Sequence, residues 1–222
     1  MASQLRTSST GHPGKKDFFI VDTLSRLEEI RNLSAWTAAR SAEPSHPPYR
    51  VDAVPHKGLG LVAARVIECG EKIVSELPLL LFGSGLNTRD IGGLNRVFAD
   101  AVDGLSPTSR AAYLDLANPP SLVELPYLGR RMTNAFKLWE ELYGGPSVFG
   151  ESGGVFRDIS RANHSCTPNA HFDFATTNDF EGSLYAVLPI RRGEEICISY
   201  IDCHAPTKDS PPTLRRCSSW RS

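Results

Sequence analysis

Short runs of apolar residues recur along the chain between positions 49 and 202. The runs are rich in valine, isoleucine and leucine, and glycine, proline and acidic turn residues separate them. Apolar runs separated by turn residues in this way are typical of short β-strands. The segments that we predict to be strands are residues 49–51, 59–66, 72–75, 171–174, 183–188 and 195–200.

The middle of this region has a different pattern. Residues 86–143 are predicted to be mostly helical, with breaks at Gly92-Gly93, Pro107 and Pro119-Pro120. A glycine-rich loop is expected over residues 144–154. The chain is therefore predicted to hold one β-rich domain of the α+β class, interrupted by a helical insertion.

The N-terminal segment follows a helical period. Ile20, Leu24 and Leu27 are spaced as on one face of an amphipathic helix, which we predict for residues 17–40. This helix either packs on the domain or binds a partner, and packing is the commoner fate. The flanking segments are predicted to be a disordered tail at residues 1–16, a proline-rich linker up to residue 48 and an irregular tail at residues 203–222.

The composition favours a packed core over disorder, with 41% hydrophobic and 22% charged residues. Lysine and arginine total 24 against 25 acidic residues, so the chain lacks the basic footprint of a nucleic-acid-binding protein. Its longest apolar stretch, residues 77–82, is far shorter than the roughly 20 residues of a membrane span. We therefore expect no direct binding to nucleic acid or to a membrane. We also expect a monomer.

Targeting signals and cysteines indicate the compartment. Residues 1–16 lack the apolar core of a secretory signal, and acidic residues such as Asp17 and Asp22 argue against a mitochondrial presequence. The five cysteines are scattered, and no Cys-x-x-Cys pair exists. We therefore expect a reducing compartment, the nucleus, the cytoplasm or both, and neither a disulfide framework nor a self-contained zinc site.

Three segments carry the candidate chemistry. Residues 161–169 form a dense polar string, which is costly to bury unless each group has a partner, so we predict a hydrogen-bonded loop at a functional site. Residues 193–200 form a turn that runs into a strand and delivers Tyr200. Residues 57–63 contain two glycines, which allow a close approach of the backbone to a ligand.

Each segment also has a purely structural interpretation. A glycine turn before a strand is usually only a turn, residues 193–195 are typical of a charged surface, and a strand tyrosine is more often in the core. His164 beside Cys166 suggests a thiol nucleophile with its base. Neighbouring positions rarely face each other, however, and such pairs usually come from distant segments, so we do not favour a thiol nucleophile.

Taken together and in order, these segments resemble the SET domain of protein lysine methyltransferases. The similarity covers residues 49–202, and its most diagnostic string is Asn163-His164-Ser165-Cys166-x-Pro168-Asn169. The second hallmark is Gly193-Glu194-Glu195-Ile196 followed by Ser199-Tyr200. The first SET segment is matched from Gly58 through Gly70-Glu71-x-Ile73 and Glu76-x-Pro78. The string similar to the SET-and-MYND branch and its fungal relatives is Arg131-Met132-Thr133-Asn134-Ala135-Phe136.

The resemblance implies a β-rich SET fold of short strands with a helical insertion and a pseudoknot-like C-terminal segment. It also implies an S-adenosyl-L-methionine-dependent protein-lysine N-methyltransferase that acts on histones in chromatin or on other proteins. Tyr200 is the implied catalytic residue at the methyl-transfer channel, and Asn163 and His164 are implied to hold the cofactor while locking neighbouring strands. The implied cofactor-binding positions are Lys57, Gly58, Leu59, Gly60, Asn134, Asn163 and His164.

The C-terminal pattern departs from this branch. There a Cys-x-Cys-x-x-Cys cluster joins the cysteine of the Asn-His-Ser-Cys string in a zinc site, whereas Cys203 and Cys217 cannot reproduce that spacing. A MYND-type cluster is absent as well, so we expect no zinc, although a site made of Cys166, Cys203, His204 and Cys217 stays open. The cysteine cluster belongs to the post-SET segment, which forms one wall of the lysine channel in that branch. Because we expect this segment to be missing, water would enter the channel, and the alternative function is a catalytically inactive SET-fold binding or scaffold protein.

Overall fold

The computed structural model of the chain describes residues 5–9, 19–23, 46–83, 90–138, 153–175 and 181–200. Two compact units make up the chain. The first, which we call the helical unit, comprises Met1–Ser45, Val74–Arg161 and Asp173–Ser183. The second, which we call the strand unit, comprises His46–Ile73, Ala162–Phe172 and Leu184–Ser222.

A five-stranded sheet belongs to the helical unit. Its order is β1-β2-β6-β8-β7, and its strands are β1 (Leu5–Ser9), β2 (Phe19–Thr23), β6 (Leu80–Phe82), β8 (Gly153–Val155) and β7 (Phe136–Lys137). β2 and β6 are parallel, and the other neighbouring pairs are antiparallel. A Cβ atom at Gly153 would overlap the ring of Phe82, so glycine permits the close pairing of β6 and β8.

β1 and β2 differ from the sequence prediction. The pattern predicts a disordered tail before residue 17 and a helix over residues 17–40, and both predictions are wrong where β1 and β2 lie. Phe19, Ile20 and Val21 are aromatic or β-branched residues that favour strands, and they pair with β6, a long-range contact that helical spacing cannot reveal. The rest of that predicted helix, most of the linker and the predicted tail after residue 202 lie outside the described residues.

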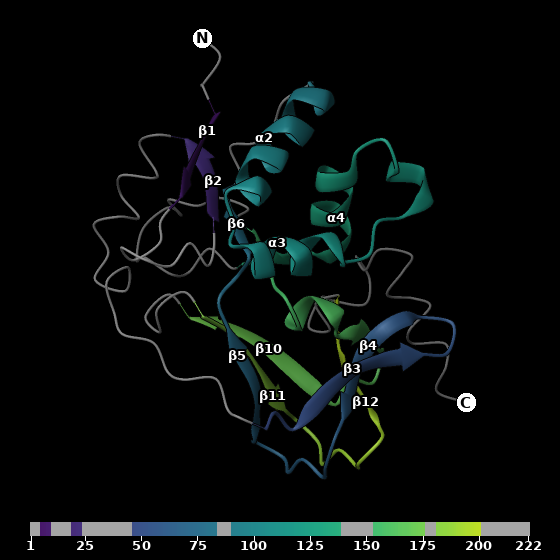
Figure 1. Cartoon of the computed structure of the whole chain (residues 1–222). Coiled ribbons are helices and arrows are strands. Elements are labelled where there is room, and N and C mark those ends of the chain that lie inside the picture. The colour runs from purple at the N-terminus through teal and green to yellow at the C-terminus, as the bar shows by residue number, and fades with distance from the viewer. Residues whose placement is uncertain are drawn as a thin grey trace, which may run out of the picture. The chain divides into compact units, whose positions relative to one another are not determined.

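Most of the described part of the predicted insertion is helical. Its helices are α2 (Ile91–Asp103), α3 (Pro107–Leu114), the 3₁₀ helix η2 (Pro120–Leu122) and α4 (Pro126–Asn134) (Figure 1). Proline begins three of them, because its missing N–H costs nothing at a first helical position. The predicted break at Gly92-Gly93 is wrong. Both glycines lie in the first turn of α2, which the Asp90 side chain caps by accepting a hydrogen bond from the Gly93 N–H (2.7 Å).

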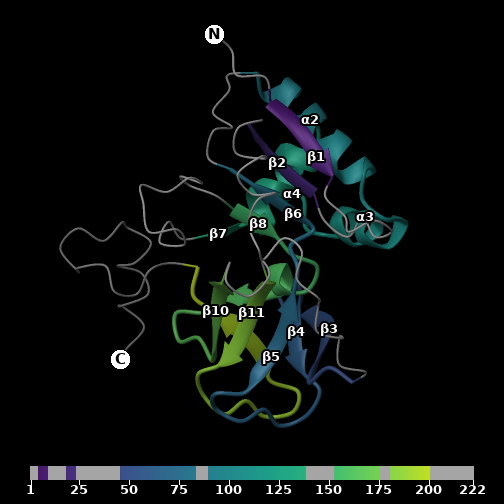
Figure 2. The same cartoon turned by 90° about the vertical axis from the view of Figure 1, so that its left-hand side faces the viewer.

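The core of the helical unit forms around α2, which lies against β1 and β2 (Figure 2). The Phe98 ring is fully buried there and meets the Phe82 ring edge-on, with ring centroids 6.0 Å apart. Tyr113 of α3 is also fully buried, and its hydroxyl donates to the Tyr127 carbonyl (2.8 Å). This bond ties α3 to α4, which ends at Asn134.

A four-stranded sheet forms the strand unit. Its order is β3-β4-β12-β9, with β3 (Tyr49–Val54), β4 (Gly58–Ala63), β12 (Glu195–Ile198) and β9 (Asn163–His164). β3 and β4 form an antiparallel hairpin. β12 is antiparallel to β4 and parallel to β9, so a strand from late in the sequence separates two earlier ones. Residues 201 and beyond of the predicted pseudoknot-like segment lie outside the described residues.

A third sheet has the order β10-β11-β5, with β10 (Ala170–Ala175), β11 (Glu181–Ala186) and β5 (Lys72–Glu76). Together with β3, β4 and β12, these strands overlap all the segments that the sequence predicts to be strands. β6, β7, β8 and β9 are not predicted, and β8 lies in the expected glycine-rich loop. The α+β class, with short strands in small sheets, is confirmed. Among the helices described, none has both the length and the apolar character that crossing a membrane requires.

Candidate active site

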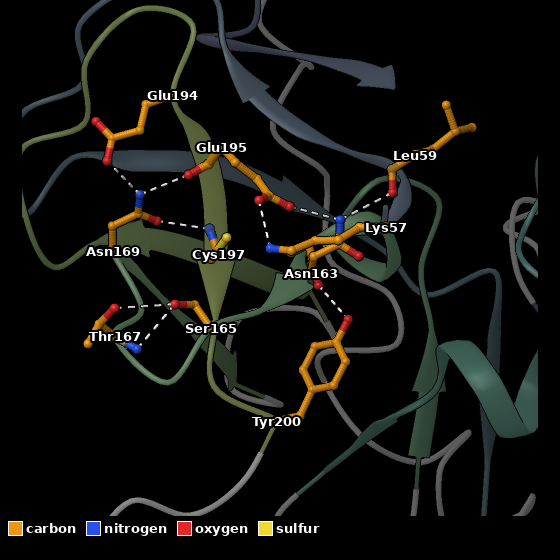
Figure 3. Close-up of polar contacts among 11 residues, drawn as sticks. Lys57, Leu59, Asn163, Ser165, Thr167, Asn169, Glu194, Glu195, Cys197 and Tyr200 are labelled. Carbon is orange, nitrogen blue, oxygen red and sulfur yellow. Dashed lines mark hydrogen bonds and ion pairs between the residues drawn. The ribbon is translucent and has the colours of Figure 1, made fainter. Parts of the chain in front are cut away.

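Two of the sequence motifs lie side by side in the strand unit. β9 and β12 pair in parallel, with Asn163 opposite Cys197. Just after β9, the Ser165 N–H donates a hydrogen bond to the Ile198 carbonyl (2.9 Å). The polar string around Asn163 is thus joined, backbone to backbone, to the segment that ends in Tyr200 (Figure 3).

Glu195 links these motifs to the turn before β4. Its Oε1 accepts a hydrogen bond from Asn163 Nδ2 (2.9 Å), and its Oε2 accepts one from Lys57 Nζ (2.8 Å) (Figure 3). Asn163 Nδ2 also donates to the Leu59 carbonyl (3.4 Å). Because two acceptors engage this NH₂ group, the orientation of the amide is fixed. Asn163 Oδ1 accepts no hydrogen bond from the residues that the structure describes.

The charges of this bridge stabilise each other. Burial raises the pKa of the Glu195 carboxyl, but the hydrogen bonds from Lys57 and Asn163 outweigh burial and hold the pKa below its ordinary value. The hydrogen bond to Glu195 raises the pKa of the Lys57 ammonium. Both side chains are therefore charged at neutral pH, and Lys57 keeps 40% of its side chain exposed.

The two glycines in the first half of β4 serve different needs. Gly58 has a φ of 80°, in the left-handed region that favours glycine, and both Gly58 and Leu59 are exposed. Gly60 is buried, and a Cβ atom there would lie 2.7 Å from Val54 Cγ2 and 2.8 Å from Asn163 Nδ2. Packing against Val54 and Asn163 is thus enough to explain why position 60 requires glycine, and close approach of a ligand is not needed to explain it.

Asn169 was not predicted as a site residue, yet its buried side chain holds β12 in place. Its Oδ1 accepts from the Cys197 N–H (2.8 Å), and its Nδ2 donates to the Glu195 carbonyl (2.9 Å) and to Glu194 Oε1 (3.4 Å) (Figure 3). The bonds to the Cys197 N–H and the Glu195 carbonyl are those that the backbone of a neighbouring strand would make. The Asn169 side chain therefore continues the hydrogen-bond ladder of β12. Asn169 and Glu195 both lie in the motifs, but their roles depend on strand register, which local sequence does not encode.

The His164 ring contacts the segment that follows β12. Its Nδ1 accepts a hydrogen bond from the Tyr200 N–H (3.1 Å), and the two ring centroids lie 5.4 Å apart. Burial and the nearby Lys57 ammonium lower the pKa of His164. The imidazole is therefore neutral at neutral pH, and the acceptor role of Nδ1 assigns its proton to Nε2.

Tyr200 combines an exposed ring with a fixed hydroxyl. The residue is 60% exposed, but its hydroxyl donates a partly buried hydrogen bond to the Ala162 carbonyl (2.8 Å) (Figure 3). Burial, followed by the nearby Cys197 and Glu195, raises the pKa of the phenol, so Tyr200 keeps its proton at neutral pH. The tyrosine is thus held in one orientation at the surface of the strand unit.

Cys166 does not provide a thiol nucleophile. Its Sγ lies 3.5 Å from His164 Nε2, so these neighbouring side chains do face each other, and the sequence argument is wrong on that point. Cys166 is disulfide-bonded, however, a state that the scattered cysteines did not predict. In the described part of the chain, no group of three His, Cys, Asp or Glu residues could hold a metal ion. Cys203, His204 and Cys217 lie outside the described residues, so the open zinc site stays untested.

Asn134 is the one predicted site residue in the helical unit. Its buried Nδ2 donates to the carbonyls of Ala117 (2.8 Å) and Arg130 (2.7 Å), which fixes the amide orientation. Its own carbonyl accepts from Ser160 Oγ (2.8 Å). The predicted site residues that the strand unit brings together are Lys57, Gly58, Leu59, Gly60, Asn163, His164 and Tyr200.

Comparison with known proteins identifies the class. Residues 58–201, more than half of the chain, match the SET domain family. The chain therefore belongs to the SET-domain family, and the resemblance stated from the sequence motifs is confirmed. The matched region contains both diagnostic strings and the helical insertion.

Several curated proteins with this domain are similar to the chain. Histone-lysine N-methyltransferase set5 of Schizosaccharomyces pombe is 30% identical over 156 residues, which cover 70% of this chain and 43% of that protein. Protein-lysine N-trimethyltransferase SMYD5 of Gallus gallus is 40% identical over 195 residues, covering 81% of this chain and 43% of the relative. N-lysine methyltransferase SMYD2-B of Danio rerio is 30% identical over 155 residues, 69% of this chain and 33% of the relative. The chain spans less than half the length of each of these relatives.

Proposed function

We propose that the chain is an S-adenosyl-L-methionine-dependent protein-lysine N-methyltransferase with Tyr200 as its catalytic residue. One observation carries the proposal: Asn163 and Tyr200 lie on adjoining segments of the strand unit, and Glu195 ties Asn163 to Lys57, in the exposed turn just before β4. Membership of the SET-domain family supports the reaction class, as do the names of the relatives.

The residues around this turn fit the chemistry of the cofactor. S-adenosyl-L-methionine carries a carboxylate, an ammonium group and ribose hydroxyls, each of which needs a partner when water is displaced. Lys57 offers a partly exposed cation to the carboxylate, and Asn163 offers Oδ1 to a donor. Gly58 and Leu59 are exposed beside Lys57, where a ligand can approach them. With Gly60 and the backbone of His164, these residues are our proposed cofactor-binding set in the strand unit.

Asn134 offers the same kind of group in the helical unit. Because its Nδ2 donates to two carbonyls, the amide has only its oxygen left to accept from a donor such as an ammonium or a hydroxyl. Its role toward the cofactor stays a proposal, based on its match to the family string.

Methyl transfer to an amine requires a neutral and well-aligned nucleophile. A lysine side chain has an ordinary pKa near 10.4, so the protein has to favour its uncharged form by keeping water away. When bound, the cofactor supplies a methyl group attached to a sulfonium. Tyr200 would steer the amine toward it, because the Tyr200 proton is committed to the Ala162 carbonyl while the oxygen lone pairs remain able to accept.

The substrate that we propose is a lysine of a histone or of another protein. One relative is named a histone-lysine methyltransferase, and another is named a protein-lysine methyltransferase. Such substrates are consistent with a location in the nucleus, the cytoplasm or both. A lysine suits the proposed site because the reaction requires an amine that is held against the phenol oxygen of Tyr200.

A two-part assay on the full chain tests the proposal. Calorimetric titration with S-adenosyl-L-methionine measures binding, and transfer of tritiated methyl groups to an array of lysine peptides measures activity. We expect binding and transfer, and no transfer to matched peptides in which arginine replaces the lysine. Binding without transfer would instead select the inactive SET-fold binding protein, and a chain that binds no cofactor would contradict the proposal.

A further inference from the structure

The imidazole of His164 has no task in the proposed function, because the resemblance to the SET family implies that His164 holds the cofactor largely through its backbone. We infer that the His164 side chain is a positioning residue that holds Tyr200 in its working orientation. This inference deepens the proposed function, on which the catalytic meaning of Tyr200 rests. The contact itself depends only on groups of the strand unit.

The contact begins where the β-ladder stops. β9 ends at His164, which lies opposite Ile198, the last residue of β12. Tyr200 comes two residues later, so no carbonyl of β9 continues the ladder at its N–H. His164 Nδ1 accepts that N–H instead, at 3.1 Å. The side chain therefore extends the strand pairing to Tyr200.

Two further contacts hold the same tyrosine. The His164 and Tyr200 rings lie against each other, with centroids 5.4 Å apart and planes inclined by 45°. The Tyr200 hydroxyl donates to the carbonyl of Ala162, a fully buried residue (2.8 Å). The backbone N–H, the ring and the hydroxyl of Tyr200 are thus all held by a stretch of three residues, whose middle member is Asn163.

The other ring nitrogen also faces the protein. His164 Nε2 lies 3.5 Å from Cys166 Sγ. Both nitrogens of the imidazole are therefore directed at protein atoms, which favours a positioning role over contact with the cofactor. Asn163, whose side chain is proposed to bind the cofactor, is thus next in sequence to His164, whose side chain is proposed to hold Tyr200.

A series of three variants separates this role from general stability. His164→Asn keeps an acceptor oxygen near the position of Nδ1, His164→Gln moves its amide toward the position of Nε2, and His164→Ala removes both. We expect kcat to fall about 10- to 100-fold in the Ala and Gln variants, because a small displacement of Tyr200 spoils alignment. His164→Asn should retain kcat within about threefold, and the Kd for S-adenosyl-L-methionine should stay within about threefold in all variants.

A second measurement needs no methyl transfer. The chain has six tyrosines, so selective ¹⁵N-tyrosine labelling gives few amide signals, and Tyr200→Phe identifies the one from Tyr200. Exchange of this amide with solvent should be at least about tenfold faster in the Ala and Gln variants, and near the wild-type rate in His164→Asn. The other tyrosine amides report whether each variant is folded.

The outcomes distinguish the inference from the proposed function. Unchanged exchange at Tyr200 in His164→Ala, or an Asn variant as defective as the Ala variant, would overturn the contact. Wild-type kcat in His164→Ala, or a parallel loss of cofactor affinity, would overturn the positioning role. If the wild-type chain transfers no methyl group, the proposed function is wrong. The amide-exchange measurements on the His164 variants still decide whether His164 holds Tyr200.

Discussion

Glu195 brings together partners that lie 32 and 138 positions away in the sequence. One carboxylate oxygen holds Asn163 and the other holds Lys57, so the proposed cofactor turn and the diagnostic asparagine share one anchor. An acidic pair after a glycine is usually part of a surface turn, which is why sequence reasoning passed over this residue. Its role becomes visible only when β12 is placed between β4 and β9.

Gly60→Ala tests whether Asn163 needs this close packing. The added Cβ would lie within 3.0 Å of Val54 Cγ2 and Asn163 Nδ2, so one of them has to move. We expect the free energy of unfolding to fall by about 1–3 kcal/mol, as for other overpacked sites. Because Asn163 would be displaced from Glu195 and Leu59, cofactor affinity measured by calorimetry should fall as well.

The matched control is another glycine-to-alanine change. Gly92 lies in the first turn of α2, where the nearest atoms to a new Cβ are 3.7 Å away. Gly92→Ala should stabilise the chain by up to about 1 kcal/mol through helix propensity and leave cofactor affinity unchanged. If Gly60→Ala behaved like Gly92→Ala, the packing account of Asn163 would be wrong.

Tyr200→Phe tests the catalytic residue at the same scale. The variant keeps the ring and the backbone N–H but loses the hydroxyl that donates to Ala162. We expect kcat to fall on the order of 100-fold, since an oriented polar group at a reacting centre contributes about that much. The Kd for S-adenosyl-L-methionine should change by no more than about threefold. Equal losses in kcat and affinity, in single-turnover and calorimetric measurements, would refute the catalytic role.

Among the elements, the end of β5 and the 3₁₀ helix η4 (Ile159–Arg161) are joined by the carboxyl of the half-buried Glu76. Glu76 Oε1 accepts hydrogen bonds from the N–H groups of Asp158 (2.9 Å) and Ile159 (2.7 Å), and thereby caps the helix start. Burial and the neighbouring Asp158 raise the pKa of Glu76 to about 8, despite these bonds. This cap therefore has a titratable group at its centre.

The raised pKa predicts a pH-dependent stability. The folded chain binds a proton at Glu76 more tightly than the unfolded chain does, so the contribution of this group is complete at acidic pH and is lost as pH rises toward about 8. Between about pH 5 and pH 8, the advantage of the neutral Glu76→Gln variant over wild type should grow by about 1 kcal/mol per pH unit. Urea unfolding at several pH values measures it. The exposed Glu68→Gln variant is the control, and a Glu76→Gln curve parallel to wild type would disprove the burial argument.

The same elements show what the sequence could and could not predict. β4 and β12 are predictable because their valine, leucine and isoleucine runs end at clear turn residues. β8 is missed because two of its residues are glycines, which pack closely against aromatic rings, Gly153 against Phe82 and Gly154 against Phe156. The start of α2 is misplaced because a cap from Asp90 outweighs the poor propensity of Gly92-Gly93. Local patterns thus predict the strands that end at clear turn residues, but not the elements that depend on a cap or on close packing.

For the whole molecule, the two units contribute different residues to the proposed site. The strand unit holds both diagnostic SET strings, and those strings contribute three residues of the proposed site, Asn163, His164 and Tyr200. The helical unit holds the insertion and Asn134, whose buried amide is fixed by the backbone around α4. The residues that were not foreseen, Glu195 and Asn169, act through strand register, a property of the assembled sheet.

If the proposed function is right, the cofactor binds around the start of β4 and at the polar string of β9. Hydrogen–deuterium exchange of the full chain, with and without S-adenosyl-L-methionine, tests it directly. We predict that the cofactor slows exchange in peptides covering residues 57–63, 161–169 and 193–200, while a peptide covering α3 is unchanged. Protection of other segments alone, or no protection at saturating cofactor, would contradict the account.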